Sequence, residues 1–264
     1  MKHILFIFMM ASSIAACNSG DDSKKPDELM YDSAANPFAK QSELPYHTIP
    51  FDKIKVSDFK PAFIEAIKLH NAEVAAIANN TAPATFENTF VAMEKSGVML
   101  NRVDLAFNVL TGANTSDALQ KVEEEMAPIL AAHNDEIFLN KKLFQRVDTL
   151  YRQLTALHLN PEAARLVEVY HQKFIMAGAG LADSGKASLK KLNEEEATLS
   201  TRFSNQLLAA AKSAALTVDS KDALSGLSET EINAASQAAQ KAGKPNSFQL
   251  AIINTTQQPA LQSL

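Results

Sequence analysis

The sequence has 264 residues, a formal net charge of −5 and a pI near 5.7. Its lysines and arginines are scattered and not gathered into a stripe, so nothing indicates a nucleic-acid partner. Eight glycines, no tryptophan and abundant Ala, Leu, Glu and Lys favour a mainly helical protein. The chain is long enough to bury a sizeable core in one domain or slightly more.

The first residues have the layout of a secretory signal peptide. Met1, Lys2 and His3 form a short basic start, residues 4–10 are apolar, and small residues continue to Ala16. This apolar block is far shorter than the ~20 residues of a membrane-spanning helix, so we expect no permanent span and a segment that is cut off or used as a targeting signal.

The single cysteine, Cys17, follows these small residues directly. The stretch Ile14-Ala15-Ala16-Cys17 resembles the bacterial lipobox. The resemblance implies cleavage between Ala16 and Cys17 and acylation of the Cys17 thiol. The protein would then be lipid-anchored in the bacterial cell envelope, facing the periplasm or the cell surface. The alternative is an ordinary secreted protein with a stray cysteine; with one cysteine, no internal disulfide can form.

Three regions follow from these features. Residues 1–16 are expected to be a lipoprotein signal peptide, residues 17–40 a lipid-anchored flexible tether, and residues 41–264 a helical lobe. The tether is assigned because Ser, Gly, Asp, Lys and Pro dominate it, and such a composition buries too little surface to offset its ordering entropy.

In the lobe, apolar residues recur at helical spacing. We expect a first helix over roughly 57–79, capped by Ser57, and a long second one over 85–110. Gly97, in the middle of the second, indicates close packing against a neighbour. In the next apolar segment, residues 119–137, Pro128 should bend or break the helix.

Three further helices are expected. Asn140 caps a segment that runs to Leu157, and Asn160-Pro161 opens another that closes near Gly178. The last runs from about Ser184 to Lys212 on an apolar stripe formed by Leu189, Leu192, Leu199, Phe203 and Leu207.

The last fifty residues change character. Residues 215–218 and 247–253 read as two short strands that pair in a small annex. Between them, Ser228 and Glu231 form a capping box that opens a helix ending at Gly243. The expected fold is therefore mainly α: a multi-helix bundle or array with a small β-containing annex near the C-terminus.

Candidate sites for chemistry are weak. Residues 180–186 have the spacing of a phosphate-binding loop, but Ala187 stands where a Ser or Thr belongs. The segment also follows a helix, so we interpret it as an interhelical turn in which Ser184 caps the next helix. Glu168-x-x-His171 is half of a di-iron motif without a second copy, and an ion pair is the favoured interpretation.

The acidic triplets 123–125 and 194–196 cannot converge on a metal, because consecutive helical residues point about 100° apart. We expect solvated faces, with one member pairing across to another helix.

The histidines at positions 47, 70, 133 and 158 have no ligand-like spacing, and we expect structural roles for them. No catalytic residue and no metal ligand is assigned in this chain.

A series of short blocks resembles the opening of the thimet-oligopeptidase-like zinc metallopeptidases, and in particular their bacterial peptidyl-dipeptidase and oligopeptidase A branches. The blocks keep the order and spacing of that family over nearly everything from residue 36 onward: Asn36-Pro37-Phe38, residues 49–55, residues 59–63, residues 85–89, Ser96-Gly97, residues 101–103, residues 131–137, residues 192–195 and residues 199–204.

The resemblance implies a helical, two-lobed peptidase that binds short peptide substrates in a channel and removes dipeptides from their carboxyl end. Zinc would be held by a His-Glu-x-x-His helix and a distant glutamate. That motif does not occur in residues 1–264. We therefore expect this chain to be an amino-terminal lobe that lacks its C-terminal catalytic region and is inactive alone. A truncated product, a partial sequence or a frameshift would each give this result; a non-catalytic peptide-binding or decayed lipoprotein is the alternative.

Overall fold

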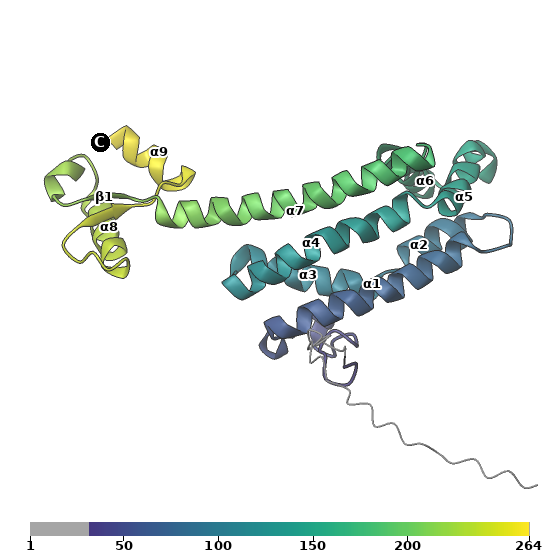
Figure 1. Cartoon of the computed structure of the whole chain (residues 1–264), viewed down its shortest axis with the longest axis horizontal. Coiled ribbons are helices and arrows are strands. Elements are labelled where there is room, and N and C mark those ends of the chain that lie inside the picture. Colours follow the sequence, from purple (N-terminus) through teal and green to yellow (C-terminus); the bar gives the residue numbers. More distant parts are fainter. Residues whose placement is uncertain (1–31, 264) are drawn as a thin grey trace, which may run out of the picture. The chain divides into compact units, whose positions relative to one another are not determined.

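The computed structural model describes residues 32–263 (Figure 1). The predicted signal peptide, Ala16, Cys17 and most of the predicted tether lie outside the described residues. The prediction of a mainly α-helical fold with a small β-containing annex is confirmed. Over the described residues, none of the helices combines the length and apolar composition needed to cross a bilayer.

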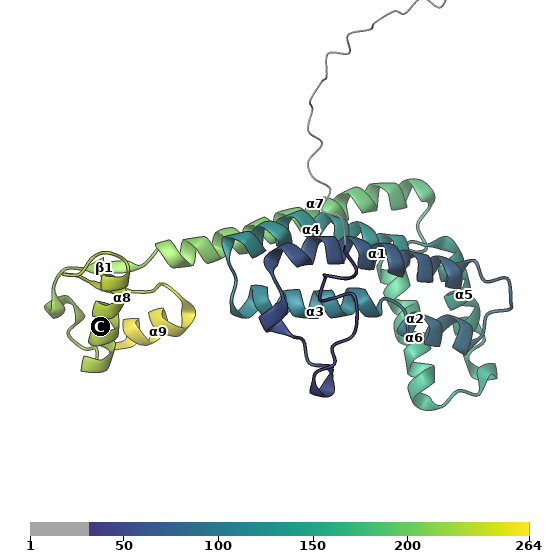
Figure 2. The same cartoon turned by 90° about the horizontal axis from the view of Figure 1, so that it is seen from below.

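Helices α1 (Val56–Ala78), α3 (Val98–Ala113) and α4 (Asp117–Phe138) pack together around an aromatic core (Figures 1 and 2). Phe107 contacts both Phe59 and Phe63 edge-on, with ring centroids 5.0 and 5.4 Å apart. Edge-to-face pairs of this kind add to the stabilisation from buried area. The other buried members of this core are Phe38, Ala62, Val103, Ala106, Leu119 and Met126.

The N-cap of α1 lies two residues earlier than the sequence predicts. It is Lys55, and the Asp58 carboxylate accepts a hydrogen bond from the Lys55 main-chain N–H at 2.8 Å. The prediction that Ser57 caps this helix is therefore wrong. An Asp in the first turn also interacts favourably with the positive end of the helix dipole, which explains why this start is preferred.

The single long helix predicted over residues 85–110 is also wrong, because the chain breaks at Gly97. A π-helical turn (Glu87–Val91) leads into the short α2 (Ala92–Glu94), and α3 starts at Val98. Gly97 has φ +69°, in the left-handed region that favours glycine. A Cβ at this position would lie 2.8 Å from Cε1 of His70, so the predicted close packing of Gly97 is confirmed.

Pro128 does not break α4, contrary to one of the predicted outcomes, because α4 runs unbroken from Asp117 to Phe138. Ser116 caps its start by accepting from the Leu119 N–H at 3.3 Å. A Pro within a helix removes one main-chain hydrogen bond, and the packing of α4 against α1 and α7 holds the helix in spite of that loss.

Helices α5 (Lys141–Arg152) and α6 (Pro161–Met176) begin where the sequence predicts. Asn140 accepts from the Leu143 N–H at 3.0 Å, and Asn160 accepts from the Ala163 N–H at 2.8 Å. With the end of α1 and the segment around α2, they enclose a second core whose buried members include Val74, Phe90, Leu143, Val147, Leu150, Val167 and Phe174.

Helix α7 (Asp183–Ser213) follows a turn at Gly178 and packs along α4 (Figures 1 and 2). Its N-cap is Ala182, which offers no side-chain acceptor, so the prediction that Ser184 caps this helix is wrong. Of the segment 180–186, residues 180–182 lie in the predicted interhelical turn and residues 183–186 form the first turn of α7.

The C-terminal segment contains the predicted strand pair. Strands β1 (Leu216–Val218) and β2 (Phe248–Leu250) are antiparallel, with Thr217 opposite Gln249. Between them, α8 (Glu229–Lys241) starts at the predicted capping box, in which Ser228 accepts from the Glu231 N–H at 3.3 Å. Helix α9 (Asn254–Ser263) follows. A small core lies here, formed by Leu224, Leu227, Ile232, Ala235 and Ala260.

Residues ahead of α1 already take part in the first core. Phe38 is buried and its ring lies 5.2 Å from that of Phe59, while Arg102 donates to the Phe38 carbonyl oxygen at 2.8 Å. Short 3-10 turns at Pro45–His47 and Phe51–Lys53 lead from this segment to α1. Packing thus begins upstream of residue 41, where the sequence places the start of the lobe.

Candidate functional site

Two histidines from different helices meet inside the helical body. His70 lies on α1 and His133 on α4, and Nδ1 of His70 is 3.0 Å from Nε2 of His133. His133 is buried, and its Nδ1 lies 2.9 Å from Oδ1 of Asn71. The pair therefore connects two of the three helices of the aromatic core through polar contacts.

The turn between α2 and α3 completes this group. Ser96 Oγ lies 3.1 Å from Nε2 of His70 and donates to the Met93 carbonyl oxygen at 2.7 Å. The Gly97 N–H donates to the Glu73 carboxylate at 2.7 Å. We call the set His70, Asn71, Ser96 and His133 the histidine cluster; it joins α1, α4 and the α2–α3 turn.

Both imidazoles are neutral at neutral pH. Burial, reinforced by the neighbouring His70, lowers the pKa of His133 to about 4, although Glu136 acts in the opposite direction. Burial also lowers the pKa of His70, opposed by the negative charge of Glu73. A charged group inside the body is disfavoured because it loses its hydration.

A hollow of about 440 Å³ adjoins the histidine cluster. Its polar lining includes Glu94, Asn101, Asp104 and Tyr170, and Tyr170 donates to Glu94 at 2.6 Å. Burial raises the pKa of the Asp104 carboxyl, opposed by a hydrogen bond from Asn108. Burial and the Glu94 carboxylate also raise the pKa of the Tyr170 hydroxyl. The lining is acidic, so it is better suited to a cationic group than to an anion.

Helix α7 has two distinct sides. Its α4-facing side includes Lys190, which pairs with Glu136, and Asn193, which donates to Asp135. Four large apolar residues lie about 120° around the helix from that side, within an arc of about 80°. We call them the α7 stripe; their exposed fractions are 61% for Leu192, 56% for Leu199, 67% for Phe203 and 59% for Leu207.

This position of the α7 stripe corrects the sequence interpretation. The stripe residues were expected on the packed side of the helix, because apolar spacing normally marks the buried face. In the structure, smaller or polar residues such as Asn193, Ala197 and Thr201 occupy the half-buried side instead. Contiguous exposed apolar surface of this kind marks a protein or ligand contact.

Asp135 is the polar centre of the α4–α7 contact. It is buried, and its Oδ1 accepts from Nδ2 of Asn193 at 2.8 Å, whereas Oδ2 has no hydrogen-bond partner within residues 32–263. A hollow of about 290 Å³ lies beside it, lined also by Asn134 and Glu196. Among the described residues, Asn193 thus supplies the one side-chain hydrogen bond that this carboxylate accepts.

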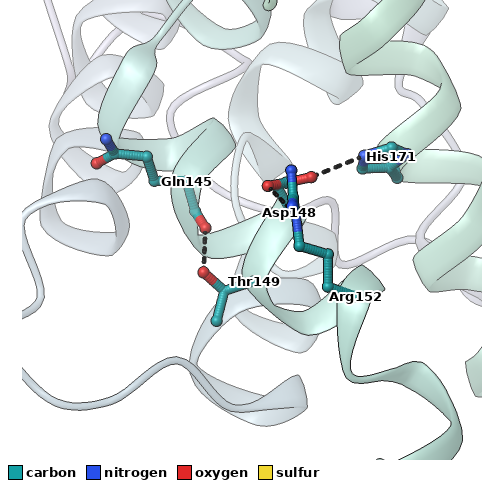
Figure 3. A network of polar contacts seen from close by, with 5 residues as sticks. All are labelled: Gln145, Asp148, Thr149, Arg152 and His171. Carbon is teal, nitrogen blue, oxygen red and sulfur yellow. Dashed lines mark hydrogen bonds and ion pairs between the residues drawn. The ribbon is translucent and has the colours of Figure 1, made fainter.

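The two residues of the Glu168-x-x-His171 motif contact different partners, and the predicted ion pair is found at Glu168. Figure 3 shows Asp148 of α5 between Arg152 and the His171 imidazole of α6, at 2.8 and 3.2 Å. Glu168 pairs instead with Arg165 at 2.7 Å. Tyr151 stacks on His171 with ring centroids 3.8 Å apart, so the imidazole serves the α5–α6 contact.

The acidic triplets also behave as predicted. Glu125 pairs across to Lys60 of α1 at 2.6 Å, while residues 194–196 stay exposed on α7. Within residues 32–263, no three His, Cys, Asp or Glu side chains lie close enough together to hold a metal ion.

The histidine cluster was missed by sequence reasoning, which gave each histidine a separate structural role. One signal was available: His133 falls on the apolar stripe of α4 with Leu119, Met126 and Leu130, a position that predicts burial. Nothing in the spacing of residues 70, 96 and 133 indicates that they meet.

Comparison with known proteins identifies relatives over most of the chain. The chain is 44% identical over 231 residues to the "Dipeptidyl carboxypeptidase" of Salmonella typhimurium, covering 88% of this chain and 34% of the relative. It is 45% identical over 229 residues to the "Dipeptidyl carboxypeptidase" of Escherichia coli, covering 87% and 34%. The "Oligopeptidase A" of Haemophilus influenzae is 22% identical over 211 residues, 80% of this chain and 30% of the relative. No family model matches the chain.

These relatives confirm the resemblance drawn from the sequence blocks, since they carry the names of both expected branches. The chain spans about a third of the length of the curated relatives it matches.

Proposed function

We propose that this chain is the amino-terminal helical part of a lipid-anchored zinc peptidase of peptidyl-dipeptidase type, which releases dipeptides from the C-terminus of short peptides. The observation that carries the proposal is the 44–45% identity to dipeptidyl carboxypeptidases over nearly nine tenths of this chain. In the complete enzyme, the helices would form one wall of the channel that receives the peptide.

The residues of this chain do not fit a zinc site. No His-Glu-x-x-His string occurs in residues 1–264, and the described residues hold no group of three metal-binding side chains. The proposal therefore assigns zinc to polypeptide outside these residues, where it would activate a water molecule and polarise the scissile carbonyl. We expect the 264-residue chain alone to have no peptidase activity.

The α7 stripe is the surface we assign to the contact with that catalytic polypeptide. Leu199 and Phe203 are more than half exposed, and they lie on the side of α7 that faces away from α4. The matched region is 34% of each relative, so about two thirds of each relative's length lies outside it. Polypeptide of that length is enough to cover the α7 stripe. Covering it would remove apolar side chains from water, at about 25 cal/mol per Å² of buried apolar area.

The first experiment on this function is to sequence the encoding DNA past codon 264. An open frame that reaches His-Glu-x-x-His supports the peptidase, and purified full-length protein should then release C-terminal dipeptides and lose that activity to a chelator. A stop codon with no nearby frame that restores the motif rejects peptidase activity for this product and favours the peptide-binding or decayed lipoprotein.

A chimera tests the stripe. Residues 32–264 would replace the matching third of the Escherichia coli relative, and Leu199→Ser with Phe203→Ser would be compared with Leu105→Ser and Val109→Ser, which alter exposed apolar residues of α3. We expect the stripe variant to lower the melting temperature of the chimera but not of the isolated chain, and the α3 control to change neither.

Equal effects of the stripe variant on both proteins would reject the stripe as a contact surface for the catalytic polypeptide. Light scattering of the isolated chain gives a second readout. A dimer that the stripe variant dissociates would show that a second copy, and not catalytic polypeptide, covers α7.

A further inference from the structure

The histidine cluster forms one continuous line of polar contacts. It runs from Asn71 through His133 and His70 to Ser96, and ends at the Met93 carbonyl oxygen. Four contacts of 2.7 to 3.1 Å make up this line. In this structure both ends of the line are hydrogen-bond acceptors: Oδ1 of the Asn71 side chain at one end and the main-chain oxygen of Met93 at the other.

The line of contacts needs one hydrogen more than two neutral imidazoles and Ser96 carry. Each contact needs one hydrogen, so the four contacts need four. A neutral imidazole has one N–H and a serine hydroxyl has one O–H, so two neutral histidines and Ser96 supply only three. One additional proton on the histidine pair supplies the fourth. With both imidazoles neutral, one contact of this arrangement would lack a hydrogen.

Turning the Asn71 amide resolves the shortage in the neutral state. The side-chain NH₂ of Asn71 would then donate to Nδ1 of His133, His133 would donate from Nε2 to His70, and His70 would donate from Nε2 to Ser96. Ser96 donates to Met93 in either case. The two ends of an amide have nearly the same shape, so the turned amide fits the same space.

We propose that His70 and His133 together form a one-proton switch, in which the pair binds a single proton and the Asn71 amide turns over when it does. The added proton binds Nδ1 of His133 and is donated to Oδ1 of Asn71, whereas the hydrogen between Nδ1 of His70 and Nε2 of His133 is present in both states. A second proton is excluded because it would set two N–H groups against each other across 3.0 Å. The switch joins α1, α4 and the α2–α3 turn, and it does not depend on the proposed peptidase function.

The surroundings set the pH at which the switch operates. Glu73 on α1 and Glu136 on α4 favour the charged form, and Glu94, Asp104 and Tyr170 line the adjoining hollow from α2, α3 and α6. Burial opposes them and lowers the pKa of both histidines. Proton uptake is therefore expected on the acid side of neutrality, below the ordinary histidine pKa of about 6.5.

NMR of the full chain with ¹⁵N-labelled histidine tests the switch directly, because long-range ¹H–¹⁵N spectra give the tautomer and charge of each imidazole. At pH 7.5 we expect both His70 and His133 to carry their hydrogen on Nε2. On acidification both should change at one shared midpoint, and His133 should gain a hydrogen on Nδ1 as one proton enters.

Two results would overturn the switch. In one, neutral His133 already carries its hydrogen on Nδ1 at pH 7.5, so the amide has no reason to turn. In the other, His70 and His133 each take up a proton at separate midpoints. Both results are read from the wild-type chain and do not depend on whether a variant folds.

The variant Asn71→Asp tests the amide itself. A carboxylate at position 71 accepts from Nδ1 of His133 but cannot turn to donate, so it holds the pair in its protonated arrangement. We expect the shared midpoint to rise by at least about one pH unit, a tenfold gain in proton affinity. Asn101→Asp is the matched control, because it adds the same charge to the adjoining hollow without touching either imidazole. Equal shifts of the midpoint in the two variants would show that the added negative charge alone causes the shift, and would reject a role for the Asn71 amide.

Discussion

Gly97 and His70 fit against each other so closely that the imidazole occupies the space of a side chain at position 97. A Cβ built on Gly97 would lie 2.8 Å from Cε1 and 2.9 Å from Nδ1 of His70. The glycine thus supplies both the left-handed turn into α3 and the room for the half-buried His70. Its conformation and its lack of a side chain are required at the same point.

Replacing Gly97 with alanine should therefore destabilise the fold. The substitution strains a residue with φ +69° and pushes a methyl group into His70, and we expect a loss of about 2 kcal/mol in the free energy of unfolding. Urea denaturation measures it. Gly112→Ala is the control: no atom lies within 4 Å of a Cβ there, and Ala is the better helix former, so stability should be unchanged or rise by up to about 1 kcal/mol. Equal losses in the two variants would contradict this account.

Stability should decrease with acidification because of His133. The folded pKa is about 4 and the ordinary value is 6.5, so between these values the unfolded chain binds a proton that the folded chain does not. The stability of the folded state with neutral His133 is fully present above pH 6.5, and it decreases progressively as the pH falls to about 4. His133 by itself contributes a slope of at most about 1.4 kcal/mol per pH unit, and His70, whose pKa burial also lowers, acts in the same direction.

The measurement is the free energy of unfolding in urea from pH 4 to 7.5. His133→Gln should flatten the dependence in that range, whereas His47→Gln, at an exposed position, should keep it. A wild-type chain as pH-dependent as its His133→Gln variant would refute the assignment.

Arg146 ties the segment before the π turn to α5. It is buried, and its guanidinium donates to the carbonyl oxygens of Asn80 and Ala82 and to Oδ1 of Asn88, at 2.9, 3.1 and 2.6 Å. A lysine ammonium cannot spread over these three acceptors as a planar guanidinium does. Arg146→Lys should lower the free energy of unfolding by about 2 kcal/mol. Arg152→Lys, on the exposed side of α5, should change it by less than about 1 kcal/mol, and an equal loss there would contradict the prediction.

Asn193 is the hydrogen-bond partner of buried Asp135. Asn193→Ala would leave the carboxylate unpaired in the α4–α7 contact, and we expect a loss of about 1–3 kcal/mol. Hydrogen exchange of α7 amides should increase as the contact weakens. Ser200→Ala is the control on the same helix, since its hydroxyl reaches only Glu196 at the surface. Unchanged exchange in Asn193→Ala would show that the pair does not hold the two helices.

Cys17 is the residue at which we predict lipidation. Expression of the full sequence in a bacterium should give a membrane-bound protein that incorporates labelled palmitate, and Cys17→Ser should abolish both. Released, unlabelled wild-type protein would instead favour an ordinary secreted chain.

Sequence reasoning succeeded where the signal is local. Asn140, Asn160 and Ser228 all cap the helices predicted for them, because an N-cap needs only a short polar side chain beside the first helical turn. The strand pair was also predicted from alternation alone, and its register places Val218 opposite Phe248.

The errors come from tertiary contacts. Gly97 ends a helix because His70 packs against it, and no pattern around residue 97 contains that neighbour. The α7 stripe shows a different error: apolar spacing normally marks the buried face of a helix, but four of the five predicted stripe residues are exposed in the structure and only Leu189 is half-buried. The histidine cluster needs three segments to meet, which only the fold determines.

The π turn at Glu87–Val91 has a consequence for chain length. A π turn holds one residue more than an α-helix uses over the same rise. Deleting one residue there, such as the exposed Glu87, would restore an α-helix and leave Met93 and Ser96 on their present faces. The same deletion within α4 would rotate every later residue by about 100° and remove His133 from His70. Among homologous sequences, a one-residue gap should therefore be tolerated at residues 87–91 and rejected in α4.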